Sequence, residues 1–305
     1  MSLSMEQIYS PTVNIYVTQG ALNVPSNKIS LIDTNALSDL AAAASKSPDI
    51  FQYIAEHLSD EGQILVLPEI ILHECAGNGR QSMDIDKFRD IYSPLLAQLS
   101  QRMPIYTVSF LDIETIMLYS AGGNKSEVLR RALIIASELF SSNIMIKKAL
   151  EEVKSFGELE AAITCISEDA GERVILFFTM IFLNEAWDVD VISNETAVFT
   201  DRIVFAPKER LRSALGNLSI DAYYEAFVVR SYDVLLFSVL IDKKDIWSKE
   251  DIITFIQQTR NNKRRRYLRI MSDAAKYAEQ FHCDNNASFI QKFYELAESR
   301  MELVF

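Results

Sequence analysis

Short apolar runs alternate with longer segments of helical periodicity over residues 1–206. Runs of four or five mostly apolar residues, bounded by polar or turn-forming residues, are typical of buried strands. Such runs occur at 28–32, 64–67 and 190–193, and residues 105–108 also fit a strand. Apolar positions at helical spacing predict helices at 36–45, 48–58, 69–75 and 171–185. This alternation is typical of an α/β fold with a parallel sheet.

The remaining segments favour helices. Residues 84–165 read as several helices separated by Pro and Gly, and residues from 207 onward read as helices alone. The expected C-terminal helices are 207–215, 220–241, 248–260, 262–282 and 286–303. We therefore expect an α/β domain over residues 1–206, with a helical insertion at about 84–160, and an all-helical domain over residues 207–305.

Composition narrows the class of protein. Hydrophobic residues make up 49% of the 305 residues, which is ample for a core, and only 9 Gly and 7 Pro favour helix. No apolar run approaches the length of a membrane span, and the first residues lack the pattern of a secretory signal. Cys75, Cys165 and Cys283 are sparse and far apart, as in a cytoplasmic protein with reduced thiols. Zinc ligand spacing and a Gly-x-Ser-x-Gly elbow are both missing from the sequence, which disfavours a zinc site or a serine hydrolase.

Charge is distributed unevenly. The net charge of −12 argues against nucleic-acid binding over the whole surface, since phosphate contacts come from Lys and Arg. Residues 1–206 hold 14 basic and 28 acidic residues, whereas residues 207–305 hold 16 and 14. The strongest basic run is Lys263, Arg264, Arg265 and Arg266, followed by Arg269. We interpret this run as a candidate patch for a nucleic-acid backbone; the alternative is a solvated helix start or an ion-paired interface with the acidic part.

Acidic residues stand at or near the ends of the expected strands. Asp33 directly follows the first strand, Glu74 lies one to two helical turns after the second, and Glu195 closely follows the third. Glu172 occupies the first turn of the apolar helix that leads into the third strand. Because ligands bind at the carboxyl ends of parallel strands, we expect these carboxylates to converge on one crevice.

Convergent carboxylates raise one another's pKa, and a divalent cation removes that conflict. Mg²⁺ and Mn²⁺ prefer oxygen ligands, and water on such a cation is acidic enough to attack a phosphodiester. The sequence therefore favours a Mg²⁺ or Mn²⁺ site built from carboxylates.

The same residues resemble the motifs of the PIN-domain family of metal-dependent nucleases, over residues 28–206. The strand followed by Asp33-Thr34-Asn35 resembles the opening motif, in which the Asp is a metal ligand and the residue two positions on helps to fix it. Residues 67–74, which end at Glu74, are similar to the second motif, and Gly171-Glu172 is similar to the third. Residues 191–195 are similar to the fourth, although the family usually has Asp where Glu195 stands.

This resemblance implies a divalent-metal-dependent endoribonuclease, similar to toxin-type members of the family, that acts on RNA rather than DNA. The implied catalytic metal ligands are Asp33, Glu74, Glu172 and Glu195, with Asn35 orienting Asp33. Asp169 is a further candidate in place of Glu172, and Asp201 in place of Glu195. An inhibitory partner protein and a homo-oligomer both stay open.

Each acid also has a purely structural interpretation. Asp33 is a favourable N-cap, Glu172 suits a helix N-terminus, and Glu74 and Glu195 are ordinary surface residues. For the whole protein, three alternatives remain: a catalytically silent PIN-like binding protein, an oligomeric interaction protein, and a metal-dependent phosphatase.

Overall fold

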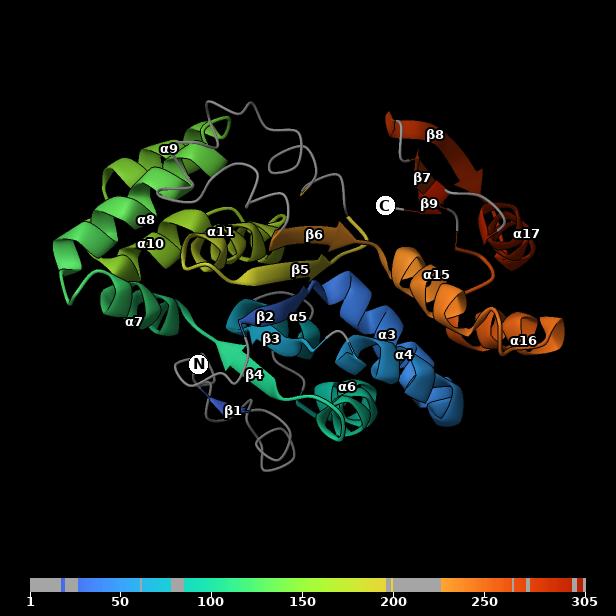
Figure 1. The fold of residues 1–305 in the computed structure, drawn as a ribbon. Helices are drawn as coiled ribbons and strands as arrows, with labels where there is room; N and C mark the ends of the chain where they lie inside the picture. The colour runs from blue at the N-terminus through green and yellow to red at the C-terminus, as the bar shows by residue number, and fades with distance from the viewer. Residues whose placement is uncertain are drawn as a thin grey trace.

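The computed structural model describes residues 18–19, 27–60, 62–77, 85–195, 199, 226–264, 266–272, 275–297 and 301–303. At its centre lies a six-stranded sheet with the strand order β1-β4-β3-β2-β5-β6 (Figure 1). The strands are β1 (Thr18–Gln19), β2 (Lys28–Ile32), β3 (Ile64–Pro68), β4 (Ile105–Val108), β5 (Asp188–Ile192) and β6 (Phe227–Arg230). Every pairing in this sheet is parallel. The expected α/β class with a parallel sheet flanked by helices is therefore confirmed.

The sheet is apolar because helices cover it. All five residues of β3 are buried, and in β2 only Lys28 is exposed. Strands that are buried on both faces read as continuous apolar runs rather than as alternating patterns. This is why residues 64–67 were recognisable as a strand from the sequence.

A group of helices surrounds α3 (Thr34–Lys46), which directly follows β2. Its neighbours are α4 (Pro48–Asp60), α5 (Glu69–Ala76), α6 (Ile85–Ser100), α15 (Tyr232–Lys243) and α16 (Lys249–Thr259). The alanines of α3 have the highest helix propensity and are small enough to admit close neighbours. The start of α3 is thereby held rigidly at the carboxyl edge of the sheet.

A second group of helices leads from β4 to β5. It comprises α7 (Phe110–Ser120), α8 (Lys125–Leu139), α9 (Ile144–Glu151), α10 (Phe156–Ile163) and α11 (Ala170–Asn184). Residues 170–183 of α11 are all buried, and the helix packs on α5, α7, α8, α10 and β5. The expected insertion at 84–160 is thus not helical throughout, because β4 lies within it and belongs to the sheet. The purely helical run is α7–α10, which lies to one side of the sheet in Figure 1.

The expectation of an all-helical domain over 207–305 is wrong. Strand β6 pairs with β5 in the central sheet, and β7 (Arg266–Ser272), β8 (Ala275–Cys283) and β9 (Met301–Leu303) form an antiparallel sheet of order β8-β7-β9. The expected helix 262–282 is replaced by the β7–β8 hairpin, in which cross-strand pairing supplies the backbone hydrogen bonds. Of the remaining expected helices, 248–260 corresponds to α16, and 286–303 corresponds to α17 (Asn286–Ala297) only in its first part, because residues 301–303 form strand β9. The expected helix 207–215 and the boundary at 206–207 lie outside the described residues.

The expected helix 220–241 is wrong in part: its described residues begin at 226 and form strand β6 and then helix α15. Phe227 and Val229 are buried in β6, and the chain turns at Ser231, whose hydroxyl accepts from the backbone N–H of Val234 and caps α15. Tertiary pairing with β5 stabilises the extended backbone of the Phe-Val-Val run.

The strand order reverses beside β2. From β2 the chain proceeds to β3 and β4 on one side, whereas β5 and β6 lie on the other. The point of reversal, between β2 and β5, is where open parallel sheets bind ligands, in the crevice outside the carboxyl ends of the strands. Asp33 follows β2 at this point, and Ser193, Asn194 and Glu195 follow β5. None of the helices in the described part of the chain is both long and apolar enough to span a membrane.

Candidate metal centre

Asp33 joins the ends of β2 and β5. Its backbone N–H donates to the carbonyl oxygen of Ile192 at 2.9 Å, which continues the β2–β5 pairing. Its carboxylate accepts from the backbone N–H of Thr34 at 2.7 Å and from the Ser193 hydroxyl at 3.0 Å. Asp33 is therefore both the N-cap of α3, as its structural interpretation requires, and a buried acid at the point of strand reversal.

Glu195 is held by the two segments that flank Asp33. The side-chain amide of Asn35 donates to Glu195 Oε1 at 3.2 Å, and the backbone N–H of Glu195 donates to Ser193 Oγ at 3.0 Å. Asn35 was expected to orient Asp33, but the contact it makes is with Glu195. The Asp-Thr-Asn motif thus supplies one acid, Asp33, at the end of β2 and holds a second, Glu195, that follows β5.

Glu74, from α5, lies against the start of α11. Thr34 Oγ1 donates to Glu74 Oε2 at 2.5 Å. A Cβ placed on Gly171 would lie only 2.7 and 2.8 Å from the two carboxylate oxygens of Glu74. Glycine at position 171 therefore allows this carboxylate to approach the helix backbone more closely than any other residue would permit.

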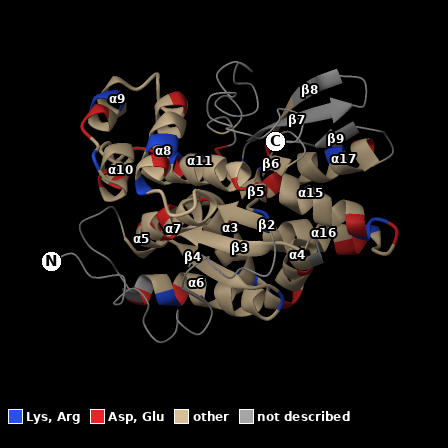
Figure 2. Ribbon diagram, turned by 60° about the vertical axis from the view of Figure 1, so that its left-hand side comes forward, with Lys and Arg blue, Asp and Glu red and all other residues tan. Residues whose placement is uncertain are grey.

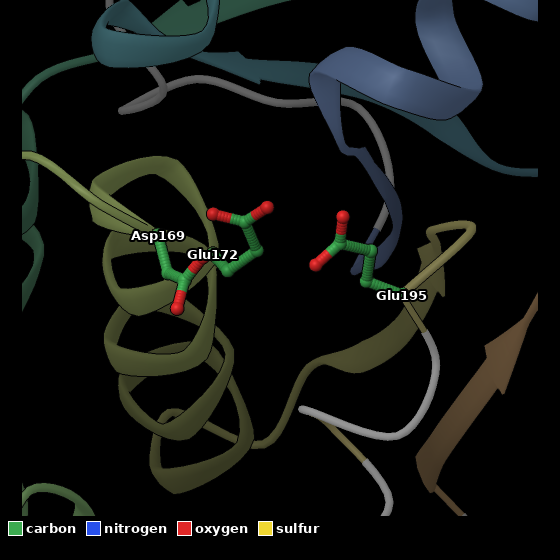
Figure 3. Close-up of side chains that lie close together, drawn as sticks. All are labelled: Asp169, Glu172 and Glu195. Atoms are coloured by element: carbon green, nitrogen blue, oxygen red, sulfur yellow. The ribbon is translucent and has the colours of Figure 1, made fainter.

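Glu172, Asp169 and Glu195 form the most compact part of the cluster. One carboxylate oxygen from each of the three residues lies within 4.8 Å of those of the other two. Figure 3 shows Asp169 and Glu172 at the first turn of α11, with Glu195 facing them from the end of β5. Glu172 is buried, whereas Asp169 and Glu195 are exposed, so the cluster opens to solvent on one side.

Asp169 stands at the N-cap position of α11 without using its side chain as a cap. Its backbone is left-handed, with φ of 53°, and no side-chain capping hydrogen bond forms. The preceding turn is fixed by the buried Arg173, which donates to the carbonyl oxygens of Ile163 at 2.8 Å and Glu168 at 2.6 Å. Asp169 therefore does not cap this helix with its side chain, and its carboxylate belongs to the acidic cluster instead.

Electrostatics link the acids. Burial raises the pKa of Asp33 to about 6 and outweighs the hydrogen bonds from Ser193 and Thr34, which lower it; Glu74 and Glu195 add smaller upward contributions. Burial also raises the pKa of Glu172 to about 7, and Asp33, Glu74 and Glu195 add to the effect. The structure thus groups the four acids that the sequence singled out at one edge of the sheet. Glu172 and Glu195 lie in the compact part with Asp169, while Asp33 and Glu74 border it through Thr34 and Gly171.

The donor set fits a hard divalent cation. Every ligand on offer is a carboxylate oxygen, the type that Mg²⁺ and Mn²⁺ prefer. Among the described residues, no Lys or Arg forms an ion pair with Asp33, Glu172 or Glu195. A cation bound there would offset the cost of burying the charges and their mutual repulsion, which together raise the two pKa values.

The basic run is placed differently from the expectation. Lys263 is exposed, but the guanidinium of Arg264 is largely buried and pairs with Asp39 and Asp233. Arg266 and Arg269 lie on strand β7 rather than on a helix, and their side chains, like Arg265, lie outside the described residues. In Figure 2 positive and negative segments are interspersed along outer helices such as α8 and α9 rather than gathered by sign.

The sequence did not indicate the roles of three site residues. Thr34 and Ser193 supply hydrogen bonds to the acids, and both are immediate neighbours of residues that had been singled out. Gly171 was noted as part of a motif, but its steric role follows only from the packing of α5 on α11. Asp201, the alternative to Glu195, lies outside the described residues.

Comparisons of the chain with protein-family models, with curated proteins and with solved structures found no match. Function is therefore inferred from the geometry and chemistry of the site itself.

Proposed function

We propose that this chain is a PIN-like nuclease that hydrolyses phosphodiester bonds of RNA with a divalent cation, Mg²⁺ or Mn²⁺. The observation that carries the proposal is the meeting of acids from four separate elements. One carboxylate oxygen each of Asp169, Glu172 and Glu195 lies within 4.8 Å of the others. Thr34 ties Glu74, and Asn35 ties Glu195, to the start of α3, where Asp33 is the N-cap. These acids meet where the strand order reverses, which is where open parallel sheets bind ligands.

The proposed roles follow from the contacts. Asp33, Glu74, Glu172 and Glu195 would hold the cation. Asp169 would extend the set on the exposed side, because its carboxylate lies within 4.8 Å of those of Glu172 and Glu195. When bound, the cation supplies a water molecule of lowered pKa and a positive charge that offsets the charge developing on the phosphate. Thr34, Asn35 and Ser193 hold Glu74, Glu195 and Asp33 in place by hydrogen bonds, each of which engages one oxygen of its carboxylate.

The open side of the cluster suits a polymeric substrate. Asp169 and Glu195 are exposed, so a phosphodiester within a long strand can approach without entering a closed cavity. Lys263 is exposed, and with Arg265, Arg266 and Arg269 it is our proposed contact to the strand backbone. Arg264 is excluded from this set because its guanidinium is paired within the protein. The resemblance to PIN-domain ribonucleases favours RNA over DNA.

The same resemblance suggests how the chain is divided into parts. The PIN-like part runs from β2 to β5, with α7–α10 as its helical insertion, and the segment from α15 onward is an addition. The order of the motifs along the chain and their meeting at one sheet edge support this division.

Cleavage of end-labelled single-stranded RNA and DNA, with Mn²⁺, Mg²⁺ or EDTA, tests the proposal. We expect RNA cleavage that needs the cation and is lost in Asp33→Asn. The matched control is Asp245→Asn, which makes the same chemical change at an exposed site and should cleave normally. Cleavage that persists in EDTA or in Asp33→Asn would overturn the proposal. RNA binding without cleavage at high protein concentration would instead favour a catalytically silent PIN-like binding protein.

A further inference from the structure

Arg264 bridges the two segments that carry the site. Its guanidinium donates to Asp39 on α3 and to Asn194 after β5, and the Asn194 amide donates back to Asp39 at 2.7 Å. The side chain of Arg264 is only 8% exposed, so these contacts lie within the protein rather than on its surface.

The two partners are sequence neighbours of site residues. Asp39 lies one helical turn after Asn35, whose amide holds Glu195. Asn194 stands between Ser193 and Glu195, so fixing Asn194 restricts the backbone that presents the Glu195 carboxylate. The backbone N–H of Tyr232 also donates to Asn194 Oδ1, at 3.3 Å, which ties α15 to the same residue.

Arg264 makes a third contact, with Asp233 on α15. Its Nε lies 3.3 Å from Asp233, a fully buried carboxylate that also accepts from Arg260 Nε at 2.9 Å. Arg260 in turn donates to Asn286 Oδ1 at 2.9 Å. The planar fork of an arginine can serve three acceptors in different directions at once, whereas lysine cannot reproduce this geometry.

We propose that Arg264 is a positioning residue that locks the Asn194–Glu195 segment against α3 and so couples the C-terminal part of the chain to the acidic site. This inference rests on the proposed function, because the expected effect of Arg264 is on the geometry of the cation ligands. It follows that loss of the bridge loosens Glu195 although Arg264 touches none of the proposed ligands.

The sign of the effect distinguishes positioning from simple charge. Arg264 carries a positive charge beside an acidic cluster, so removing that charge would by electrostatics alone strengthen cation binding. Positioning predicts weaker cation binding. A residue that orients a metal ligand without touching the metal typically contributes about tenfold or more to metal affinity.

The test uses the full chain and Mn²⁺, whose binding is followed by its electron paramagnetic resonance signal. We expect Arg264→Gln and Arg264→Lys each to bind Mn²⁺ about tenfold more weakly than the unaltered protein. Asn194→Ala, which keeps the Arg264–Asp233 pair, should show the same direction of change if the arginine variants fold poorly. Leu150→Ala, a core change in α9 far along the chain from the bridge, is the control for general loss of stability.

A second measurement needs no metal. Hydrogen exchange at the backbone amides of Glu195 and Tyr232 should become faster in Arg264→Gln and Asn194→Ala, but not in Leu150→Ala at equal fraction folded. Equal or tighter Mn²⁺ binding in Arg264→Lys and Asn194→Ala, or unchanged exchange at both amides, would overturn the inference. Absence of Mn²⁺ binding to the unaltered protein would instead refute the proposed metal site, and the exchange rates would still decide whether the bridge holds Asn194.

Discussion

Replacing Asp33 with Asn is expected to stabilise the metal-free protein at pH 7.5 and to remove its response to Mn²⁺. Asn has the same size as Asp but carries no charge. Its carbonyl oxygen can still accept from the N–H of Thr34, and the Ser193 hydroxyl can turn to accept from the new amide. The substitution thus removes a buried charge, and the asparagine can still form hydrogen bonds with Thr34 and Ser193.

The size of the effect follows from the pKa of Asp33. Its value of about 6 in the folded protein exceeds the ordinary 3.8, and each pKa unit corresponds to about 1.4 kcal/mol. Because the pKa of Asp33 is higher in the folded than in the unfolded protein, ionising Asp33 lowers the free energy of unfolding. This loss is absent below pH 3.8, grows up to about pH 6 and is constant above it. Ionised Asp33 therefore costs about 3 kcal/mol at pH 7.5, as an upper bound.

Denaturant unfolding in EDTA at pH 5 and pH 7.5 measures this difference. We expect Asp33→Asn to exceed the unaltered protein in stability at pH 7.5 by up to about 3 kcal/mol, and by a smaller amount at pH 5. Added Mn²⁺ should stabilise the unaltered protein, since a ligand that binds only the folded state must do so, and should leave Asp33→Asn unchanged.

The matched control is Asp233→Asn, because Asp233 is also a buried acid but has a cationic partner. Asp233 and Arg260 are both fully buried and lie 2.9 Å apart, so losing one charge leaves the other unpaired. This variant should be less stable by about 3–5 kcal/mol, the opposite sign to Asp33→Asn. If Asp33→Asn is less stable than the unaltered protein in EDTA at pH 7.5, the argument from buried like charge is refuted.

Two further predictions concern the same cluster. Gly171→Ala should displace the Glu74 carboxylate and weaken Mn²⁺ binding by about tenfold, as measured by titration, while stability changes by no more than about 1 kcal/mol. Gly157→Ala is its control, because a Cβ at Gly157 meets nothing within 4 Å, and equal Mn²⁺ affinity in the two variants would contradict the steric argument. Mn²⁺ affinity should rise between pH 5.5 and pH 8, because Asp33 and Glu172, with pKa values of about 6 and 7, must lose protons to bind a cation. A flat binding profile over this range would exclude both as ligands.

The acids were predictable because their placement follows from strand geometry. Asp33 stands directly after an apolar strand and Glu195 three residues after another, and parallel strands bring their carboxyl ends to the same edge. Glu172 was recognisable from the apolar helix that follows it, and Glu74 from the strand and proline before it. Local sequence patterns were sufficient for these positions because neighbouring elements repeat the same strand–helix unit.

The C-terminal part was not predictable from local patterns. Residues 266–283 contain many helix-forming side chains, and their extended conformation depends on pairing between distant positions, such as Arg266 with Cys283. For β6 a signal was present, since the β-branched pair Val228-Val229 precedes a good N-cap, Ser231. The partners of Arg264 could not be inferred, because a run of basic residues gives no indication of which one turns inward.

The spacing of the site residues along the chain has a consequence for synthesis. The Asn35–Glu195 hydrogen bond spans 160 positions, and the Arg264–Asn194 bond spans another 70. Contacts between such distant positions must wait for the intervening chain, because the ribosome adds residues in order and loop closure precedes any gain from the contact. A nascent chain that ends before β5 contains Asp33 and Glu74 but neither Ser193 nor Glu195. If the site cuts RNA, its complete ligand set is assembled only when most of the protein has already left the ribosome, so the ribosome's own RNA is not exposed to a finished site during early synthesis.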